Sequence, residues 1–235
     1  KAEEFLVGES GGRIVTSMYC IPFTAWVGGA PQGLVGIAGV TVAPEARRKG
    51  CASALMAEGL RRARAEGRTL SALYAFRHDF YASLGYALAG ERRVWEVNPA
   101  DLPLYAEREG VRRGAPEDVD ALSACYERVM RRSTLMVERS EVEWRDEILE
   151  ERKQFFAVYE DGEGAVRGYF LFRYEELSDG RPTRLVIPEV AYESEEALRG
   201  LLGHVASLRD QFVEAQWVLP ADERLELRLR NPRRR

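Results

Sequence analysis

The clearest candidate for a functional segment is residues 40–53, which read V-T-V-A-P-E-A-R-R-K-G-C-A-S. This order predicts a strand, a turn and a helix start, so that the turn amides and the first helical amides would point into one concavity. The positive end of the helix dipole favours an anion there. Gly50 would let the backbone approach that anion closely because it has no Cβ. With Arg47, Arg48 and Lys49 beside it, the segment predicts a binding site for a pyrophosphate.

The three cations also have a plainer explanation, which is a solvated basic turn before an amphipathic helix. Charge alone favours that explanation. Their position favours binding, because cations directly before a helix start oppose the helix dipole unless a bound anion compensates them. The backbone edges of Val40 and Val42 would in addition offer free groups to an extended ligand that carries amides.

The residues around this segment indicate a strand-rich first half. Strands are expected at 4–8, 13–27 and 36–42, a helix from Cys51 to Gly67, and further strands at 70–74 and 87–97. Pro44 ends the third strand because proline cannot donate to a ladder. The helix is amphipathic, and Gly67 is its expected C-terminal stop. The first half therefore predicts a mixed α/β layer.

The second half restarts this order after a proline-containing stretch without a clear period. Its expected elements are a helix opened by Pro116, a helix with a capping box of Ser140 and Glu143, strands at 155–159, 166–174 and 185–191, a helix capped by Ser194, and a strand at 215–219. The two halves share the order of elements and almost no residues. We therefore expect two similar domains, residues 1–98 and 111–235, joined by a linker at 99–110.

The composition excludes several classes of function. The net charge of −4 gives no electrostatic footprint for nucleic acid. The longest uncharged apolar stretch, residues 33–43, is too short to cross a bilayer, and the opening K-A-E-E predicts no signal peptide. Three cysteines and two histidines, widely spaced and without a CxxC pair, predict no metal site. We expect a protein of the reducing cytoplasm with no metal, no membrane and no nucleic-acid partner.

Residues 40–53 resemble the acetyl-CoA motif of the GNAT superfamily, V-x-V-x-P-x-x-R-R-x-G followed by a helix that starts with small residues. The matching positions are Val40, Val42, Pro44, Arg47, Arg48 and Gly50. In that family the strand backbone binds the pantetheine amides and the turn amides bind the pyrophosphate. The resemblance implies acetyl-CoA as cosubstrate and tandem GNAT-like acyl-CoA N-acyltransferase folds. The cofactor contacts that it implies are Val40, Thr41, Val42, Arg48, Lys49, Gly50, Cys51, Ala52 and Ser53.

A second pair of segments, L-S-A-L-Y at 70–74 and F-Y-A-S-L-G-Y at 80–86, resembles the FYxxxGY region of the Eis-like branch (enhanced intracellular survival proteins). Those proteins are aminoglycoside acetyltransferases with two fused GNAT domains and a third, sterol-carrier-like domain. The resemblance covers residues 4–235 and implies that the first domain lacks the family's opening strand and helices. In these relatives the terminal carboxylate of the third domain is the general base. They assemble as oligomers, so we expect a homo-oligomer.

Tyr81 is the general acid that this resemblance implies. A phenol with an ordinary pKa of about 10 stays protonated at neutral pH and can donate to a departing thiolate. The alternative is a ring that only packs beside Tyr86. Phe76 and Arg77 stand where the family contacts the cofactor, although relatives often have Ser-Glu there. His78 is interpreted either as a base or proton shuttle or as an exposed loop residue.

The reaction implied is acetyl transfer from a thioester to a primary amine of a cationic small molecule, such as an aminoglycoside or a polyamine. Two alternatives stay open, namely a protein lysine or N-terminus as acceptor, and a CoA-binding assembly module without turnover. The second domain reads P-E-V-A-Y-E-S-E-E at 188–196, with acids where the first domain has Arg-Arg-Lys. These carboxylates would repel a pyrophosphate, so we expect no CoA in the second domain.

Overall fold

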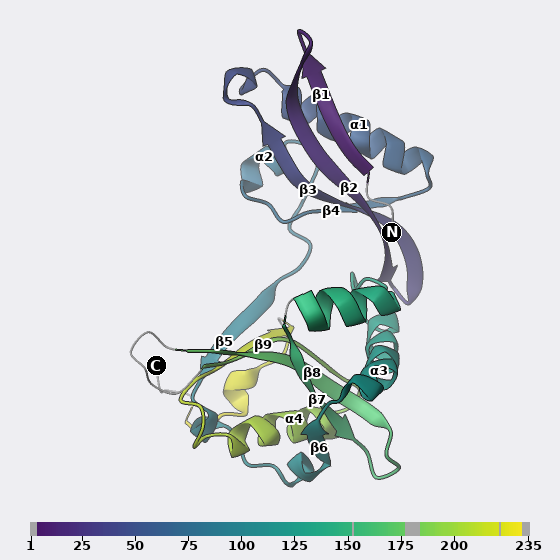
Figure 1. The fold of residues 1–235 in the computed structure, drawn as a ribbon. Helices are drawn as coiled ribbons and strands as arrows, with labels where there is room; N and C mark the ends of the chain where they lie inside the picture. Colours follow the sequence, from purple (N-terminus) through teal and green to yellow (C-terminus); the bar gives the residue numbers. More distant parts are fainter. Residues whose placement is uncertain (1–3, 152, 177–183, 221, 232–235) are drawn as a thin grey trace. The chain divides into compact units, whose positions relative to one another are not determined.

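The computed structural model describes residues 4–151, 153–176, 184–220 and 222–231. The chain divides into two compact units, drawn in Figure 1, and each unit has its own sheet. The first unit comprises the residues up to Ala89 together with Met130–Glu138, and the second comprises Gly90–Val129 and the residues from Arg139 onward. No helix within the described ranges is long and apolar enough to span a membrane.

The first unit is a four-stranded sheet with one long helix. Its elements are β1 (Glu4–Ser10), β2 (Arg13–Val27), β3 (Ala30–Val42), the 3-10 turn η1 (Pro44–Ala46), α1 (Cys51–Ala65), β4 (Leu70–Ala72) and the short helix α2 (His78–Ala82). The strand order is β1-β2-β3-β4, and every pair is antiparallel except β3–β4. A parallel pair needs a crossover connection, and α1 supplies it.

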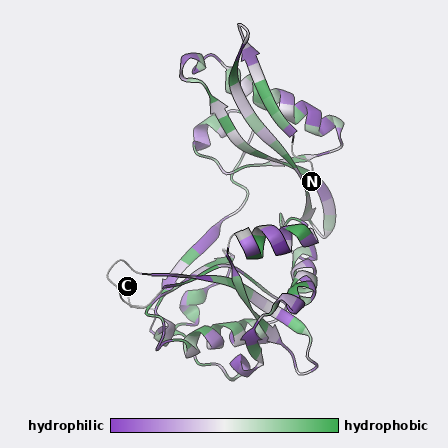
Figure 2. Ribbon diagram, in the orientation of Figure 1, coloured by the Kyte–Doolittle hydropathy of each residue, from purple (hydrophilic) through white to green (hydrophobic). Residues whose placement is uncertain are grey.

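Helix α1 packs its apolar side on one face of this sheet. Gly59 lies in the contact, where a Cβ would come within 2.2 Å of the Met18 side chain, so the small residue lets helix and strand approach closely. Figure 2 shows the apolar residues, in green, along the strands and the helix. The buried core consists of Leu6, Met18, Cys20, Val35, Ile37, Leu55, Met56, Ala63 and Tyr81.

Strand β3 carries a bulge near its C-terminal end. Gly39 and Val40 together lie opposite Met18 of β2, and Gly39 has a φ of 59°, which glycine adopts without strain. Strand β4 pairs only with residues 34–36 of β3. Among the described residues, no strand therefore pairs with the outer edge of β3 between the bulge and Val42.

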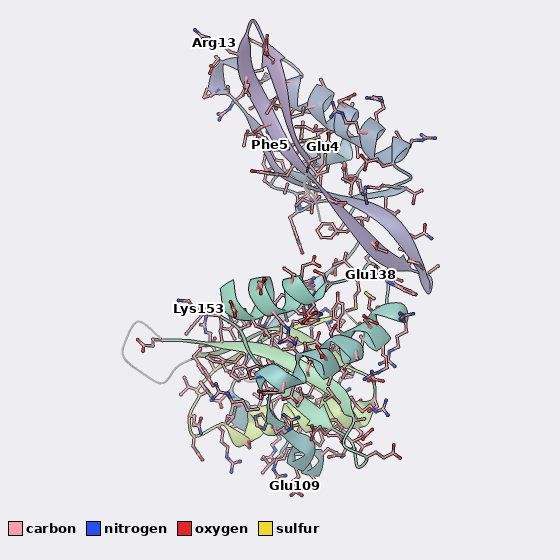
Figure 3. The ribbon with its side chains drawn as sticks, turned by 45° about the vertical axis from the view of Figure 1, so that its right-hand side comes forward. Glu4, Phe5, Arg13, Glu109, Glu138 and Lys153 are labelled. Atoms are coloured by element: carbon pink, nitrogen blue, oxygen red, sulfur yellow. The ribbon has the colours of Figure 1, made fainter. Side chains whose placement is uncertain are left out.

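Residues 130–138, which begin with the last residues of a helix, also belong to the first unit. The amide of Leu135 donates to the carbonyl of Trp26 at 2.7 Å, and the amide of Trp26 donates to Met136 at 2.9 Å. The indole Nε1 of Trp26 also donates to Glu138, labelled in Figure 3, at 3.1 Å. The guanidinium of Arg131 lies over the same indole, 4.9 Å from its centroid. The end of β2 is thus held by residues that come much later in the sequence.

The second unit is built on a six-stranded sheet in the order β5-β10-β9-β8-β7-β6. Its strands are β5 (Arg92–Val97), β6 (Val111–Arg113), β7 (Phe155–Glu160), β8 (Val166–Glu175), β9 (Arg184–Tyr192) and β10 (Ala215–Pro220). The second half of the chain also forms α3 (Val119–Arg131), the π-helix η5 (Glu143–Glu151), α4 (Glu195–Ser207) and the 3-10 turns η2 (Pro99–Asp101), η3 (Ala106–Gly110), η4 (Pro116–Asp118) and η6 (Leu225–Leu227). The β9–β10 pair is parallel, and α4 is its crossover.

The two units repeat one architecture, as the sequence predicts. Each contains three consecutive antiparallel strands, then a crossover helix and a strand parallel to the third. These are β1, β2, β3, α1 and β4 in the first unit, and β7, β8, β9, α4 and β10 in the second. In β9 the residues Ile187 and Pro188 lie opposite Phe172, just as Gly39 and Val40 form the bulge of β3. The mixed α/β fold expected from the sequence is confirmed.

Two stretches differ from their expected places. Strand β5, which sequence analysis assigned to the first domain, pairs with β10 of the second sheet, and Trp95 lies opposite Trp217 there. The stretch 99–110 packs on the second unit rather than connecting freely, because Leu102 is buried in the second core and Tyr105 packs against it. Both differences have the same cause: these apolar side chains find a hydrophobic core only in the second unit.

Candidate cofactor site

The loop between β3 and α1 has an uncommon backbone. Gly50, the last residue before the helix, has φ 80° and ψ 2°, and Arg48 has φ 60°. Left-handed residues in a turn direct successive amides toward one side, as in the backbone concavities that bind anions. For Arg48 this conformation costs roughly 1–2 kcal/mol, so the loop around it must enforce the geometry.

The amides that follow are without partners in the described protein. The first amide of the helix that bonds is that of Ala54, which donates to the Gly50 carbonyl at 3.0 Å, and no side chain caps the helix. Across the described ranges, no carbonyl or side chain accepts from the amides of residues 48–53. These amides are therefore available to a ligand or to solvent.

Three cations surround this row of amides. Arg47, Arg48 and Lys49 are exposed, and none of them forms an ion pair with a residue that the structure describes. Several other cations of the unit pair with a carboxylate, as Arg62 of α1 does with Glu58 at 2.7 Å. The loop thus concentrates unpaired positive charge beside free amides, which suits a phosphate group.

The strand edge that leads to the loop offers backbone groups. The Ala43 amide and the Thr41 carbonyl both bond to β2, at 2.8 and 2.7 Å. The backbone groups of successive residues in a strand point to opposite edges, so those of Val40 and Val42 point away from β2, toward the edge that β4 leaves open. Thr41 is turned the other way, and its hydroxyl also bonds Ser17 at 2.7 Å.

Tyr81 lies in α2 within the core under α1 and is only 4% exposed. Its ring packs edge-to-face against Phe76, Phe80 and Tyr86, with centroid distances of 5.6, 5.0 and 6.0 Å. Burial raises the pKa of the Tyr81 phenol above its ordinary value. Its hydroxyl bonds to no residue of the described part of the chain.

Tyr86 differs from Tyr81 in this respect. Its hydroxyl lies 2.6 Å from the Ser71 Oγ of β4 and is hydrogen-bonded to it. Burial, the largest influence, raises the pKa of Tyr86, and the bond to Ser71 partly opposes that rise. Of the two neighbouring tyrosines, Tyr86 uses its hydroxyl to hold the fold, while that of Tyr81 has no such use.

Of the other residues expected near the site, one contacts Tyr81 and two lie exposed at the surface. Phe76 is 70% exposed and covers one side of the Tyr81 ring. Arg77 is also exposed and pairs with Asp79 at 2.9 Å, so its charge is already matched. His78 is an exposed residue at the start of α2. The structure thus brings Phe76 to Tyr81 and leaves Arg77 with a carboxylate of its own.

The first turn of α1 completes the site. Cys51, Ala52 and Ser53 are half-buried, and their amides continue the row that begins at residue 48. This cysteine forms no disulfide, and neither do Cys20 and Cys125. Within the described ranges, no group of three or more His, Cys, Asp or Glu side chains is placed to hold a metal ion.

In the second unit, the loop between β9 and α4 corresponds to this site, and its backbone is capped by a side chain of the chain itself. β9 ends at Tyr192 and α4 begins at Glu195, and the intervening Ser194 accepts from the Ala197 amide at 3.2 Å through its Oγ. A residue of the chain thus bonds an amide of the first turn, whereas the first turn of α1 has no such cap.

The carboxylates of this junction are paired as well. Glu193 pairs with Arg128 at 2.8 Å, and Glu195 pairs with Arg228 at 2.5 Å. Glu196 accepts from the Tyr159 hydroxyl at 3.0 Å. Acids at a helix start suit the dipole and oppose a second anion.

Sequence reasoning missed two features of the first unit. The bulge at Gly39 could have been found, because a glycine inside a strand pattern often marks a bulge. The left-handed backbone of Arg48 has no such signal, since arginine rarely adopts it and nothing in the residue type announces it.

Comparison with known families gives two matches, to two different models that are each described as an acetyltransferase (GNAT) domain. One covers residues 1–89 and the other covers residues 135–235. Among curated proteins, one described as an uncharacterized N-acetyltransferase of Streptomyces griseus is 38% identical over 84 residues, which are 36% of this chain and 20% of that protein.

Solved structures share the fold over nearly the whole chain. A GCN5-related N-acetyltransferase from Kribbella flavida is 30% identical with a TM-score of 0.76, over 96% of this chain and 55% of that one. Eis1 from Mycobacterium abscessus is 20% identical with a TM-score of 0.77, over 97% of this chain and 60% of that one. The chain thus spans less than two thirds of the length of these relatives. Because a GNAT acetyltransferase domain model matches each of its halves, the chain belongs to the GNAT acetyltransferase family as a tandem of two such domains.

Proposed function

We propose that the first unit binds acetyl-CoA along residues 40–53 and that the protein transfers the acetyl group to a primary amine. The observation that carries the proposal is the row of amides at 48–53, which bond to no described residue and start between the left-handed Arg48 and Gly50. Such a row at a helix start, with unpaired cations beside it, stabilises a diphosphate. The residues present fit that group, because a Cβ built on Gly50 would meet no atom within 4 Å.

The outer edge of β3 supports the same proposal. Val40 and Val42 point their backbone groups away from β2, where an extended chain with amides would bond as an added strand does. β3 runs from its bulge toward the loop. A ligand laid along this edge with its diphosphate at residues 48–53 would therefore have its thioester end toward Gly39.

Tyr81 is the group that we propose as general acid. Acetyl-CoA supplies an activated thioester. The amine nitrogen bonds to the acetyl carbon and loses a proton to solvent, while the carbon–sulfur bond breaks and the departing sulfur takes up a proton. A group that holds a proton for the departing sulfur lowers this barrier. Tyr81 is suited to the role because burial raises its pKa, which keeps the phenol protonated at neutral pH, and because its hydroxyl is bonded to no described residue. The ring of Phe76 shields it on one side.

The acceptor that we propose is a cationic amine, aminoglycoside-like or a polyamine. The Eis-like fold and the net charge of −4 agree with such an acceptor. The alternatives are a protein lysine or N-terminus, and a module that binds CoA without turnover. We place the protein in the reducing cytoplasm, which suits three cysteines that form no disulfide. We also propose that it assembles as a homo-oligomer. We further propose that the second unit binds no CoA, because its junction carboxylates are paired within the chain.

Two measurements test this proposal together. Calorimetric titration with CoA should give one site per chain, and a thiol-release assay with acetyl-CoA should respond to an aminoglycoside or to spermidine. Release only with a lysine peptide would move the acceptor to proteins, and binding without release from any amine would favour the module. Absence of CoA binding would refute the site at residues 40–53 altogether.

A further inference from the structure

Residues 222–231, which we call the C-terminal strap, follow β10 in the second unit. The strap contains η6 and buries Leu225 completely in the core that α4 forms with the sheet. In Figure 1 it is the yellow segment that lies on the sheet near α4. In the first unit the chain segment that follows the parallel strand β4 is residues 73–82, which include α2.

The strap connects the end of β9 to the start of α4 through side chains. The Tyr192 hydroxyl donates to Glu223 at 2.9 Å. Arg228 donates to the same Glu223 at 2.9 Å and to both carboxylate oxygens of Glu195, at 2.5 and 3.0 Å. Only 20% of the Arg228 side chain and 12% of the Glu223 side chain are exposed, so the charge-assisted bond between them is largely shielded from water. The side chain of Glu195 is 59% exposed, so its bonds to Arg228 lie at the surface.

The strap is also fixed at its far end. The amide of Arg230 donates to the carbonyl of Asp101 in η2 at 2.8 Å. Between this bond and the buried Leu225, the guanidinium of Arg228 reaches the first residue of α4. A cation at a helix start is unfavourable by itself, and here Glu195 and Glu223 compensate it.

The first unit shows no such bridge in its described residues. Residues 73–82 form no hydrogen bond or ion pair with the loop 43–50 or with the first turn of α1. Both units thus share a bulged strand, a crossover helix and a parallel strand, yet only in the second unit does the chain itself tie strand end to helix start.

We infer that the C-terminal strap fills, in the second unit, the place that the first unit offers to a cofactor, and that Arg228 is its anchor. The comparison of the two places rests on the proposed function, whereas the contacts of the strap do not. The second unit is therefore an acyltransferase fold occupied by its own chain, and the strap holds the first turn of α4 in place.

Hydrogen exchange followed by mass spectrometry on the whole chain tests the anchor. In Arg228→Ala we expect the amides of residues 195–199 and 222–231 to exchange about tenfold faster, because Glu223 and Glu195 lose their partner and the strap opens locally. The matched control is Arg224→Ala, which removes an arginine of the same segment that is 59% exposed and pairs with Glu226. This control should leave the exchange rates of both peptides at their wild-type values. If Arg228→Ala does not fold, Glu195→Gln should give a smaller increase in the same two peptides.

Two results would overturn the inference. Exchange of both peptides at the wild-type rate in Arg228→Ala and Glu195→Gln would show that Arg228 anchors nothing. A second equivalent of CoA bound by the wild-type chain would show that the strap does not fill the second site. A chain that binds no CoA at all, with the exchange response intact, would instead refute the proposed function of the first unit and leave Arg228 as the anchor of the strap.

Discussion

Arg48 and Gly50 both have a left-handed backbone, with φ of 60° and 80°, and a single residue separates them. Glycine adopts this conformation freely, whereas a residue with a Cβ is strained in it. The loop therefore holds Arg48 in a strained conformation, and the amides that follow have no partners in the described protein. Hydrogen bonds from these amides to a bound ligand can offset the strain.

Gly50→Ala should therefore affect stability and binding separately. A Cβ at this position meets no heavy atom within 4 Å, so the loss of stability should be only the backbone strain, about 1–2 kcal/mol. Affinity for CoA should fall more than tenfold if the loop relaxes to relieve that strain, because the amides then no longer converge. Thermal unfolding and calorimetric titration measure the two effects.

Gly67→Ala is the matched control for this change. Gly67 has the same φ of 80° and equally open surroundings, but it follows the opposite end of α1. It should lose similar stability and bind CoA with unchanged affinity. Equal losses of affinity in the two variants would mean that general destabilisation, and not the loop geometry, governs binding.

The unpaired cations give a second prediction. Lys49→Ala should weaken CoA binding about tenfold, because an exposed cation beside free amides contributes a charge-assisted contact to phosphate. The dependence of the dissociation constant on salt concentration should also become shallower. Arg64→Ala removes an exposed cation from the last turn of α1 and should change neither quantity. A uniform effect of both substitutions would point to net charge rather than to a local contact.

Residue patterns predicted the frame of the first unit well, because each of its signals is local. Pro44 ended a strand, Gly67 followed a helix, and a run rich in β-branched and aromatic residues marked β2, whose bounds agree with the expected 13–27. Partners were harder to predict. Strand β5 pairs with β10, which lies more than a hundred positions later, and the choice between two apolar faces depends on packing that a single sequence does not display.

The site shows the same division. The free amides after Gly50 follow from a helix start without a capping side chain, which the sequence displays. The two roles of Tyr81 and Tyr86 do not, since they depend on Ser71 lying 2.6 Å from one hydroxyl and not the other. The π-helical form of Glu143–Glu151 was equally hidden: the capping box of Ser140 is present, with its amide 2.6 Å from Glu143, but a cap fixes where a helix starts and not its pitch.

Tyr81→Phe gives a third prediction. If the phenol protonates the leaving sulfur, kcat should fall by about 10²–10⁴, with little change in the dissociation constant for CoA. Tyr86→Phe is the control, because it breaks the bond to Ser71 and should cost about 1 kcal/mol of stability while kcat stays close to that of the wild type. Equal kcat for Tyr81→Phe and wild type would exclude the tyrosine as the acid.

The pH profile sharpens this test. Burial raises the pKa of Tyr81, so the protonated form required of a general acid should persist beyond pH 10. The wild-type kcat should therefore decline only at a pH above the ordinary tyrosine range. The Tyr81→Phe variant should lack this alkaline decline. A decline at the same pH in both proteins would assign it to another group.

In the second unit, Arg139 and Glu189 form a bidentate pair at 2.8 and 2.6 Å. The Tyr169 hydroxyl donates to the same carboxylate at 2.7 Å, and the guanidinium lies over the Trp144 ring, 4.6 Å from its centroid. Burial by itself would raise the pKa of Glu189, but the hydrogen bonds and charge of Arg139 outweigh it and hold that pKa below its ordinary value.

Because the pKa of Glu189 is lowered in the folded state, the unfolding free energy of the second unit should depend on pH in the acidic range. The folded state binds the proton of Glu189 less tightly than the unfolded state does, so the contribution is present above the ordinary glutamate pKa of about 4.3. It is lost as pH falls below that value toward the folded pKa. Glu189→Gln should lower the unfolding free energy at pH 7 by about 3 kcal/mol, because Arg139 then stays behind without a countercharge.

Denaturant unfolding between pH 7 and pH 3 measures this effect. The unfolding free energy of Glu189→Gln should be lower than that of the wild type at pH 7. The two values should converge as the pH falls, since the wild type loses the Arg139–Glu189 pair when Glu189 is protonated. Glu58→Gln is the control, because Glu58 has a pKa lowered to about 2 by its hydrogen bonds to Arg61 and Arg62 but lies on the surface, where such pairs contribute little. Its curve should follow that of the wild type throughout. Parallel curves for Glu189→Gln and the wild type would mean that the pair with Arg139 does not control the acid sensitivity of this unit.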